Sequence, residues 1–232
     1  MMHLFFGADR GGRGAPLTAA VAALAACAGS LFQSKAPPTA MYQLSARPVG
    51  AAGAPRTGPE IAADLSILHP RVRTGLDSDR IAVLYPNRRL DYLGNARWSG
   101  SLDEVMQDLT LQAFRERANL RGVHAEESGF AGGYWLEIDV ADFQAEYSGD
   151  PGAPGSGAAG GAPPTVHVHL VASLGSAGDR QMLGRFEADV RRPAATNRVA
   201  AIVEAYDHAV DAALGQVVAA SVDALGKRDG AR

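Results

Sequence analysis

The chain has 232 residues, of which 47% are hydrophobic, and a formal net charge of −3 at pH 7. This length fits one large domain or two small ones, with enough apolar side chains for a core. The weakly acidic charge provides no basic field of the kind that binds nucleic acids, so we expect no nucleic-acid partner. The single cysteine, Cys27, excludes an intramolecular disulfide.

The N-terminal residues have the pattern of an export signal. A segment with two arginines precedes the uncharged stretch 17–26, which consists of Leu, Thr, Ala and Val. A helix that spans a bilayer needs about 20 apolar residues, so this stretch is too short to cross a membrane. Its length is typical of the apolar part of a secretory signal peptide, and the small side chains before Cys27 suit a signal peptidase. We therefore predict a signal peptide at residues 1–26.

The end of this stretch resembles a bacterial lipobox. Leu24, Ala25 and Ala26 precede Cys27, whose position is that of the cysteine that receives a diacylglycerol and further acyl chains such as palmitate. Two other interpretations remain open. One is a secretory signal with a cysteine near its end, and the other is a buried core cysteine, although no amphipathic pattern surrounds Cys27. The resemblance predicts a lipid anchor on Cys27, and two or more acyl chains suffice for stable anchoring.

The residues after the cysteine predict a tether and indicate which membrane holds the anchor. Residues 27–40 have no helical or strand period and contain a Pro-Pro pair, so we interpret them as the lipidated cysteine and its tether. Ala28, rather than aspartate, follows Cys27. By resemblance to the sorting rule of Gram-negative lipoproteins, this predicts anchoring in the outer membrane, with the chain on its periplasmic face.

Short strand-like runs follow, separated by glycine and proline. β-branched, aromatic or alternating content predicts strands at 42–45, 63–68, 80–85, 134–140, 143–147, 166–171 and 182–190. We expect the last two runs to form a hairpin. The small, Gly/Pro-rich segment 148–164 buries almost no apolar surface, and its composition predicts a disordered loop or hairpin insertion.

Two helices complete the expected elements. Ser101 and Glu104 have the spacing of a capping box before an apolar-periodic segment, which predicts a helix over 101–118. A longer periodic segment predicts a helix over 197–225, ended by Gly226 and followed by two cations.

The order of these elements favours one α+β domain. We predict that the domain covers residues 41–226 and that 227–232 form a tail. Strands precede each of the two helices, so both helices are expected to pack on one face of a largely antiparallel sheet.

Two histidines are the strongest candidates for a metal site. His167 and His169 alternate on a predicted strand, which places both imidazoles on one face. A catalytic zinc needs a third protein ligand, and no motif places His124 or Glu137 beside the pair. Because one face of this strand is apolar, two solvent-facing histidines are the simpler interpretation, and we predict no metal.

The sequence contains no motif of an established catalytic class. It has no nucleophile elbow, no Walker A sequence and no dinucleotide fingerprint after a strand. The acid pairs Asp139 with Asp142 and Glu126 with Glu127 have no positioned third group, so solvated carboxylates are the simpler interpretation. We therefore predict no catalytic residue, no cofactor and no enzymatic activity. A periplasmic metalloenzyme that uses the two histidines is the remaining enzymatic alternative.

Several segments together resemble one family. The residues "YQL" at 42–44, and "DSDRIAVLYPNRRLDYLGNARWSGSLDEVMQDLTLQAF" at 77–114, precede a strand pair and a long helix. They are similar to the ABC-type transport auxiliary lipoprotein (paraquat-inducible protein C-like) family. The resemblance covers roughly residues 41–220. Its most specific part is "RIAV" followed by "LDYLGNARWS", which is a packing signature rather than a catalytic one.

Three residues of the signature are assigned to packing. They are Tyr42, Leu44 and Trp98. Trp98 lies just before the Ser101 cap, where an aromatic ring usually packs under the helix that follows. The alternative role for Trp98 is contact with a partner or with lipid.

The resemblance implies a role in transport. It implies partners in the form of an ABC permease, its ATPase and a membrane-anchored Mce-type substrate-binding protein, which move phospholipid or other lipid between the inner and outer membranes. The lipoprotein would dock the Mce protein at the outer membrane and support the integrity of that membrane. A homo-oligomeric ring around a symmetric Mce partner is compatible with this role. The rival is an envelope-assembly lipoprotein that binds an outer-membrane protein.

Overall fold

The computed structural model describes residues 38–45, 60–129, 132–149 and 161–230. The described residues from Thr39 onward belong to one compact unit. The lipobox residues and Cys27 lie outside the described residues, so the signal peptide, the lipid anchor and the tether remain predictions.

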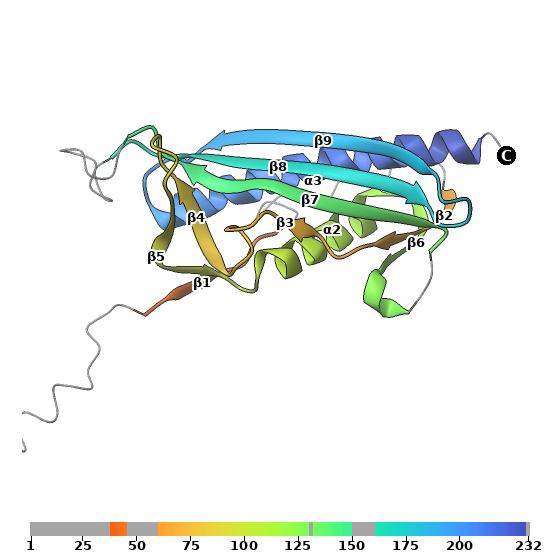
Figure 1. Ribbon diagram of the computed structural model, residues 1–232, viewed down its shortest axis with the longest axis horizontal. Helices are drawn as coiled ribbons and strands as arrows, with labels where there is room; N and C mark the ends of the chain where they lie inside the picture. The colour runs from red at the N-terminus through yellow and green to blue at the C-terminus, as the bar shows by residue number, and fades with distance from the viewer. Residues whose placement is uncertain (1–37, 46–59, 130–131, 150–160, 231–232) are drawn as a thin grey trace, which may run out of the picture. The chain divides into compact units, whose positions relative to one another are not determined.

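The described residues form nine strands, two α-helices and one short 3-10 helix (Figure 1). In chain order they are β1 (Ala40–Tyr42), β2 (Ile61–Ile67), β3 (Arg71–Val72), β4 (Arg80–Leu84), β5 (Leu90–Trp98), α2 (Leu102–Arg117), β6 (Leu120–Ala125), η1 (Glu126–Ser128), β7 (Tyr134–Glu146), β8 (Thr165–Ser176), β9 (Met182–Pro193) and α3 (Val199–Asp229). The predicted α+β class is confirmed.

All nine strands belong to one mixed sheet. Its longest ladders are antiparallel: β7 pairs with β8 over most of its length, and β8 pairs with β9. The predicted hairpin between the last two strands is therefore confirmed. The opposite edge of β7 is occupied in succession by β2, β3 and β4, each in a short parallel pairing. β6 adds to β2, and β5 and then β1 add to β4.

Two predicted strands are one strand in the structure. The runs 134–140 and 143–147 join in β7, with a register shift against β8 between Val140 and Asp142. A β-bulge inserts one extra residue and so preserves the alternation on both sides of it. Val140 and Phe143 both face the core, and Asp142 faces away from it. The alternation of apolar residues is interrupted at Ala141. In the sequence this interruption indicated two separate strands, whereas in the structure it is a bulge within one strand.

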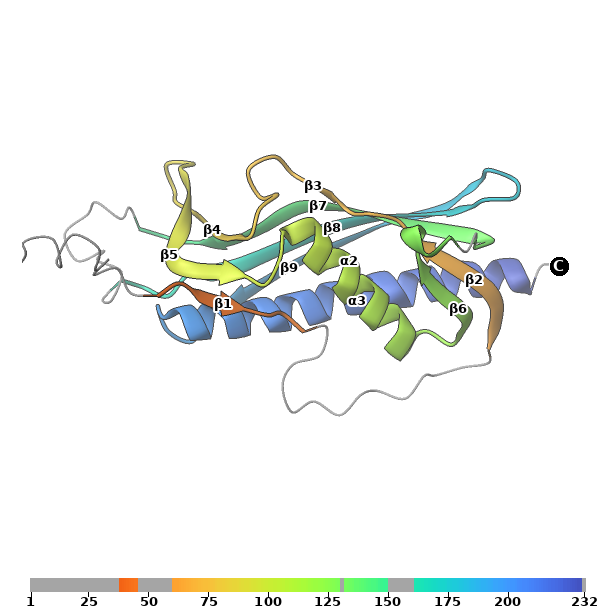
Figure 2. The same ribbon diagram turned by 90° about the horizontal axis from the view of Figure 1, so that it is seen from below.

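Both helices cover the same face of the sheet, as Figure 2 shows. α3 runs along β8 and β9, and α2 crosses between α3 and the β2–β6 region. One hydrogen bond of the predicted capping box at α2 runs from the Ser101 amide to the side chain of Glu104, where Oε2 accepts at 3.3 Å. The helices also contact each other, since Arg117 Nη1 donates to the Asp211 carbonyl at 3.1 Å.

The predicted end of the second helix at Gly226 is wrong. α3 continues to Asp229, and Gly230 caps it with right-handed angles. Lys227 forms an ion pair with Asp223 one turn earlier, and Arg228 reaches the β8–β9 turn. Gly226 does not adopt the left-handed angles that would end a helix, and these contacts support the turn that follows it. α3 is also apolar and long enough to cross a membrane by length and composition, but its apolar side packs on the sheet.

An aromatic cluster lies where α3 meets the sheet. Trp98 is 1% exposed and contacts Tyr206 and Phe143 edge-on, at ring-centroid distances of 5.1 and 6.1 Å. Tyr206 is also fully buried, and its hydroxyl donates to the Ala82 carbonyl at 3.2 Å. Ala82 lies at the point where the register between β4 and β5 shifts. This one hydrogen bond thus gives both the buried Tyr206 hydroxyl and the strand carbonyl a partner.

Candidate functional site

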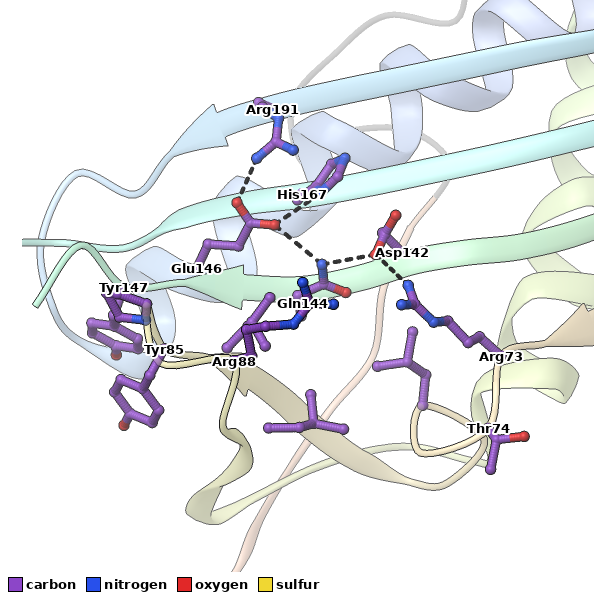
Figure 3. A pocket seen from close by; sticks show the side chains of 14 residues that line it. Arg73, Thr74, Tyr85, Arg88, Asp142, Gln144, Glu146, Tyr147, His167 and Arg191 are labelled. Carbon is purple, nitrogen blue, oxygen red and sulfur yellow. Dashed lines mark hydrogen bonds and ion pairs between the residues drawn. The ribbon is translucent and has the colours of Figure 1, made fainter. Parts of the chain in front are cut away.

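The sheet face that turns away from α2 and α3, here called the outer face, carries a pocket of about 640 Å³ (Figure 3). This volume lies in the range of small-molecule sites. The pocket is bordered by the β3–β4 connection, the β4–β5 turn and the outward positions of β7, β8 and β9. Its lining residues are Arg73, Thr74, Leu76, Leu84, Tyr85, Pro86, Arg88, Leu90, Asp142, Gln144, Glu146, Tyr147, His167 and Arg191.

Glu146 is at the centre of the pocket floor. Its Oε1 lies 2.9 Å from His167 Nδ1 and accepts from Gln144 Nε2 at 3.2 Å. Its Oε2 accepts from Arg191. Burial opposes the ionisation of Glu146, but the hydrogen bonds from His167, Gln144 and Arg191 outweigh it and lower the pKa of the carboxyl group. Glu146 is therefore an ionised and fully engaged acceptor.

Gln144 links this group to a second carboxylate. It is only 3% exposed, and its Nε2 also donates to Asp142 Oδ1 at 3.1 Å. Its Oε1 accepts from the Phe143 amide at 2.8 Å, so the buried side chain uses both ends. Asp142 Oδ1 further accepts from Arg73 Nη1 at 2.8 Å. The floor is thus a connected network in which each carboxylate has a cation beside it.

The histidines belong to this network. The prediction that both face solvent is wrong for His167, which is 5% exposed and lies between Glu146 and Asp189, with Nε2 2.9 Å from Asp189 Oδ1. His169 lies in the same way between Asp142 and Glu187. A neutral imidazole has one N–H, so each ring donates to both neighbours only when it is protonated.

The two histidines lie on one face of β8, as their alternation predicted, but among the described residues no third ligand joins them. The two rings stack nearly in parallel, with centroids 6.3 Å apart. Among the described residues, no group of three or more histidine, cysteine, aspartate or glutamate side chains has an arrangement that could hold a metal ion. The acid pairs considered from the sequence are engaged as well: Arg71 contacts Asp139, Gln107 contacts Glu127, and neither carboxylate is simply solvated.

One wall of the pocket is aromatic and apolar. Tyr85 and Tyr147 stack with centroids 5.4 Å apart, and Leu90 beside them is 38% exposed. The Tyr147 hydroxyl donates to Asn197 Oδ1 at 2.8 Å, which fixes the ring against the start of α3. Burial raises the pKa of Tyr147, and the neighbouring Tyr85 adds to this effect, so the phenol remains neutral at physiological pH.

Arg88 lies at the rim on the β4–β5 turn. The turn is closed by the Arg88 amide, which donates to the Tyr85 carbonyl at 2.9 Å, and by the Tyr85 amide, which donates to the Arg89 carbonyl at 3.0 Å. Arg88 has a φ of 64°, in the left-handed region that side chains rarely adopt. Among the described residues, its guanidinium has no carboxylate or aromatic partner, and Figure 3 shows the side chain extending toward the middle of the pocket.

The three packing residues predicted from the sequence lie away from this pocket. The parallel register of β1 and β5 places Tyr42 beside Trp98, and Leu44 after β1 is 5% exposed. The Ser45 amide then donates to Asp207 Oδ1 at 3.0 Å, which joins this segment to α3. Of the pocket residues, sequence reasoning had singled out His167 and Asp142, but in separate roles and not as parts of one site. It missed Arg73, Glu146 and Arg191, and the turn at Pro86 and Asn87 placed Arg88 without its surroundings.

Residues 42–218, from the end of β1 into α3, match a family model that is described as ABC-type transport auxiliary lipoprotein component. The chain belongs to this family. The membership agrees with the resemblance noted in the sequence. It identifies the chain as a lipoprotein-family protein and implies an ABC-type transporter as its partner and a membrane-anchored place in the cell envelope.

Solved structures support the same fold. Protein XCC0632 from Xanthomonas campestris, assigned to the DUF330 family, is 22% identical, with a TM-score of 0.65, and the match covers 83% of this chain and 100% of that one. An uncharacterized protein is 12% identical, with a TM-score of 0.57, and covers 79% of this chain and 99% of its own. At these identities the likeness concerns the fold alone. A search of curated proteins finds no match.

Proposed function

We propose that the chain is a non-enzymatic outer-membrane lipoprotein of an Mce-type ABC transport system, which moves lipids between the inner and outer membranes. Its part is to dock the Mce substrate-binding protein. The observation that carries the proposal is the family match over residues 42–218, which begins soon after the lipobox-like residues that end at Cys27.

The anchor defines where the chain acts. A lipidated Cys27 at the end of a tether holds the α+β unit at the periplasmic face of the outer membrane, and Ala28 favours that membrane over the inner one. An Mce protein fixed in the inner membrane reaches the lipoprotein across the periplasm. The acyl chains on one cysteine supply stable anchoring without a membrane-spanning helix.

The chemistry of the described pocket supports a binding role rather than a catalytic one. Glu146 and Asp142 are the pocket carboxylates, and each accepts hydrogen bonds from two or more protein groups. A general base needs a free lone pair within reach of substrate. The low pKa of Glu146 makes it a weaker base still.

Co-purification tests both parts of the proposal. The full chain with a C-terminal tag is extracted from membranes in mild detergent, and mass spectrometry identifies the proteins that accompany it and the mass carried by Cys27. The expected result is an acylated Cys27 together with an Mce-domain protein. A matched Cys27→Ala variant should lose the acyl mass and the membrane fraction. An acylated protein that brings only an unrelated outer-membrane protein would support the envelope-assembly rival and refute the transport role.

A genetic comparison checks the consequence for the membrane. Deletion of the gene should sensitise cells to detergents to the same degree as deletion of the other components of the transport system. Normal detergent resistance in this deletion, beside sensitivity in the others, would contradict the proposed role.

A further inference from the structure

We propose that the outer-face pocket is a binding site for a phosphate group, with Arg88 as its main anchor. The group is either free phosphate or the phosphate of a phospholipid headgroup. This inference does not depend on the transport role, because it follows from the hydrogen-bonding capacity and charge of the pocket alone.

The charges of the pocket favour an anion. Three arginines line it, Arg73, Arg88 and Arg191, against two carboxylates, Asp142 and Glu146. Each carboxylate is already paired with an arginine, Arg73 with Asp142 and Arg191 with Glu146. Arg88 has no partner among the described residues, so it is the cation whose charge the described pocket leaves uncompensated.

The unpaired charged groups of the pocket are guanidinium donors, because both carboxylates already accept from arginine. Glu146 uses both oxygens as acceptors, and Asp142 accepts at Oδ1 from Arg73 and Gln144. A guanidinium has five N–H donors, whereas the hydrogen bonds of Arg73 use only its Nη1. The N–H groups left over lie on exposed side chains, where a ligand with several acceptor oxygens can replace their water. Phosphate fits this requirement, and arginine binds it bidentately.

The surroundings of Arg88 add an apolar side to the site. Leu90 is 38% exposed and lines the pocket together with Leu84 and the Tyr85 ring. A phosphate ester with an apolar part can place its phosphate at the arginines and its hydrocarbon along this wall. The buried floor, where Gln144 is 3% exposed, is held by its own hydrogen bonds and is formed before a ligand arrives.

The test compares two turn arginines in the full chain. Arg88 and Arg180 are both exposed, and both lie on hairpin turns with positive φ, 64° and 54°. Arg180 does not line the pocket. Asparagine tolerates the left-handed region, so Arg88→Asn and Arg180→Asn remove the two cations with the same small backbone cost. All three proteins are purified in the same nonionic detergent, so that the contribution of the micelle is equal.

Two probes are titrated calorimetrically at low salt: inorganic phosphate and dihexanoylphosphatidic acid. The expected result is binding to the parent chain and to Arg180→Asn, and affinity about ten- to hundredfold lower for Arg88→Asn, as expected for a lost charged hydrogen bond. Added sodium chloride should weaken binding. Phosphatidic acid that binds at least about tenfold more tightly than phosphate assigns the site to a headgroup, and equal affinities assign it to free phosphate.

Two results would overturn the proposal. The first is that neither probe binds the parent chain. The second is that Arg88→Asn and Arg180→Asn weaken binding alike, since binding would then lie outside the pocket. Circular dichroism of each variant, matched to the parent chain, shows that the fold is intact. Failure of this site would leave the co-purification with an Mce protein unaffected.

Discussion

Replacement of Trp98 by alanine should lower the free energy of unfolding by about 3–5 kcal/mol. The indole is 1% exposed, so alanine removes almost all of a buried ring and leaves a cavity between α3 and the sheet. The edge-on contacts with Phe143 and Tyr206 account for about 0.5–1.5 kcal/mol each. Domains of this kind are stable by about 5–15 kcal/mol, so the substitution removes a large share of the total.

Urea unfolding followed by circular dichroism measures the loss, and the melting temperature should fall by about 6–20 °C for a unit of this size. Trp135 provides the matched control. It lies half-buried on the outer face over Gly175, and Trp135→Ala should cost about 1 kcal/mol. A loss below about 1 kcal/mol for Trp98→Ala, or one equal to that of the control, would refute the packing role. It would favour the alternative in which Trp98 contacts a partner or lipid.

Two further predictions concern backbone space and pH. A Cβ on Gly132 would lie 2.7 Å from Ser66 Oγ and 2.8 Å from a backbone oxygen, whereas a Cβ on Gly133 would have no atom within 4 Å. In the same urea assay, Gly132→Ala should therefore lower the free energy of unfolding by about 1–3 kcal/mol, and Gly133→Ala by much less. The hydrogen bond to Asp103 raises the pKa of His69 above its usual value. Its contribution to stability is therefore complete below about pH 6.5 and disappears as the pH rises through the folded pKa. Unfolding measured from pH 5.5 to 8.5 should show this loss in the parent chain, and a pH profile of His69→Gln with the same slope would contradict the assignment.

The elements that sequence reasoning found are those with local signals. Ser101 and Glu104 mark the start of α2 within one turn of chain, and the actual helix begins one residue after Ser101. The alternation in β8 and β9 placed their hairpin because both strands and their turn lie close together in the chain. Signals of this kind need no knowledge of distant partners.

The missed features depend on partners far away in the sequence. β5 runs through Gly94 and Asn95, which are poor strand residues, and it is stabilised by pairing with β4 and β1. The pocket depends on the register of β7, because the bulge after Val140 is what turns Glu146 outward toward Arg191. No pattern within a single strand gives the register between strands.

The connection between β7 and β8 follows from pairing as well. Glu146 and Thr165 are partners across the two strands, so the Gly/Pro-rich segment joins neighbouring antiparallel strands, as one of its two interpretations required. Its residues 150–160 lie outside the described ranges, and the disorder expected there remains a prediction. An insertion at a hairpin end costs little, because loop-closure entropy grows only with the logarithm of length.

The aromatic cluster has a consequence for how the protein folds. Trp98 comes from β5, but its ring partners come from β7 and from α3, which is the last of the described elements. Contacts between distant residues form slowly, since the chain between them must be closed first. A chain that is synthesised from its N-terminus therefore cannot complete this core until α3 has followed. Truncation within α3 should therefore abolish folding of the earlier strands as well.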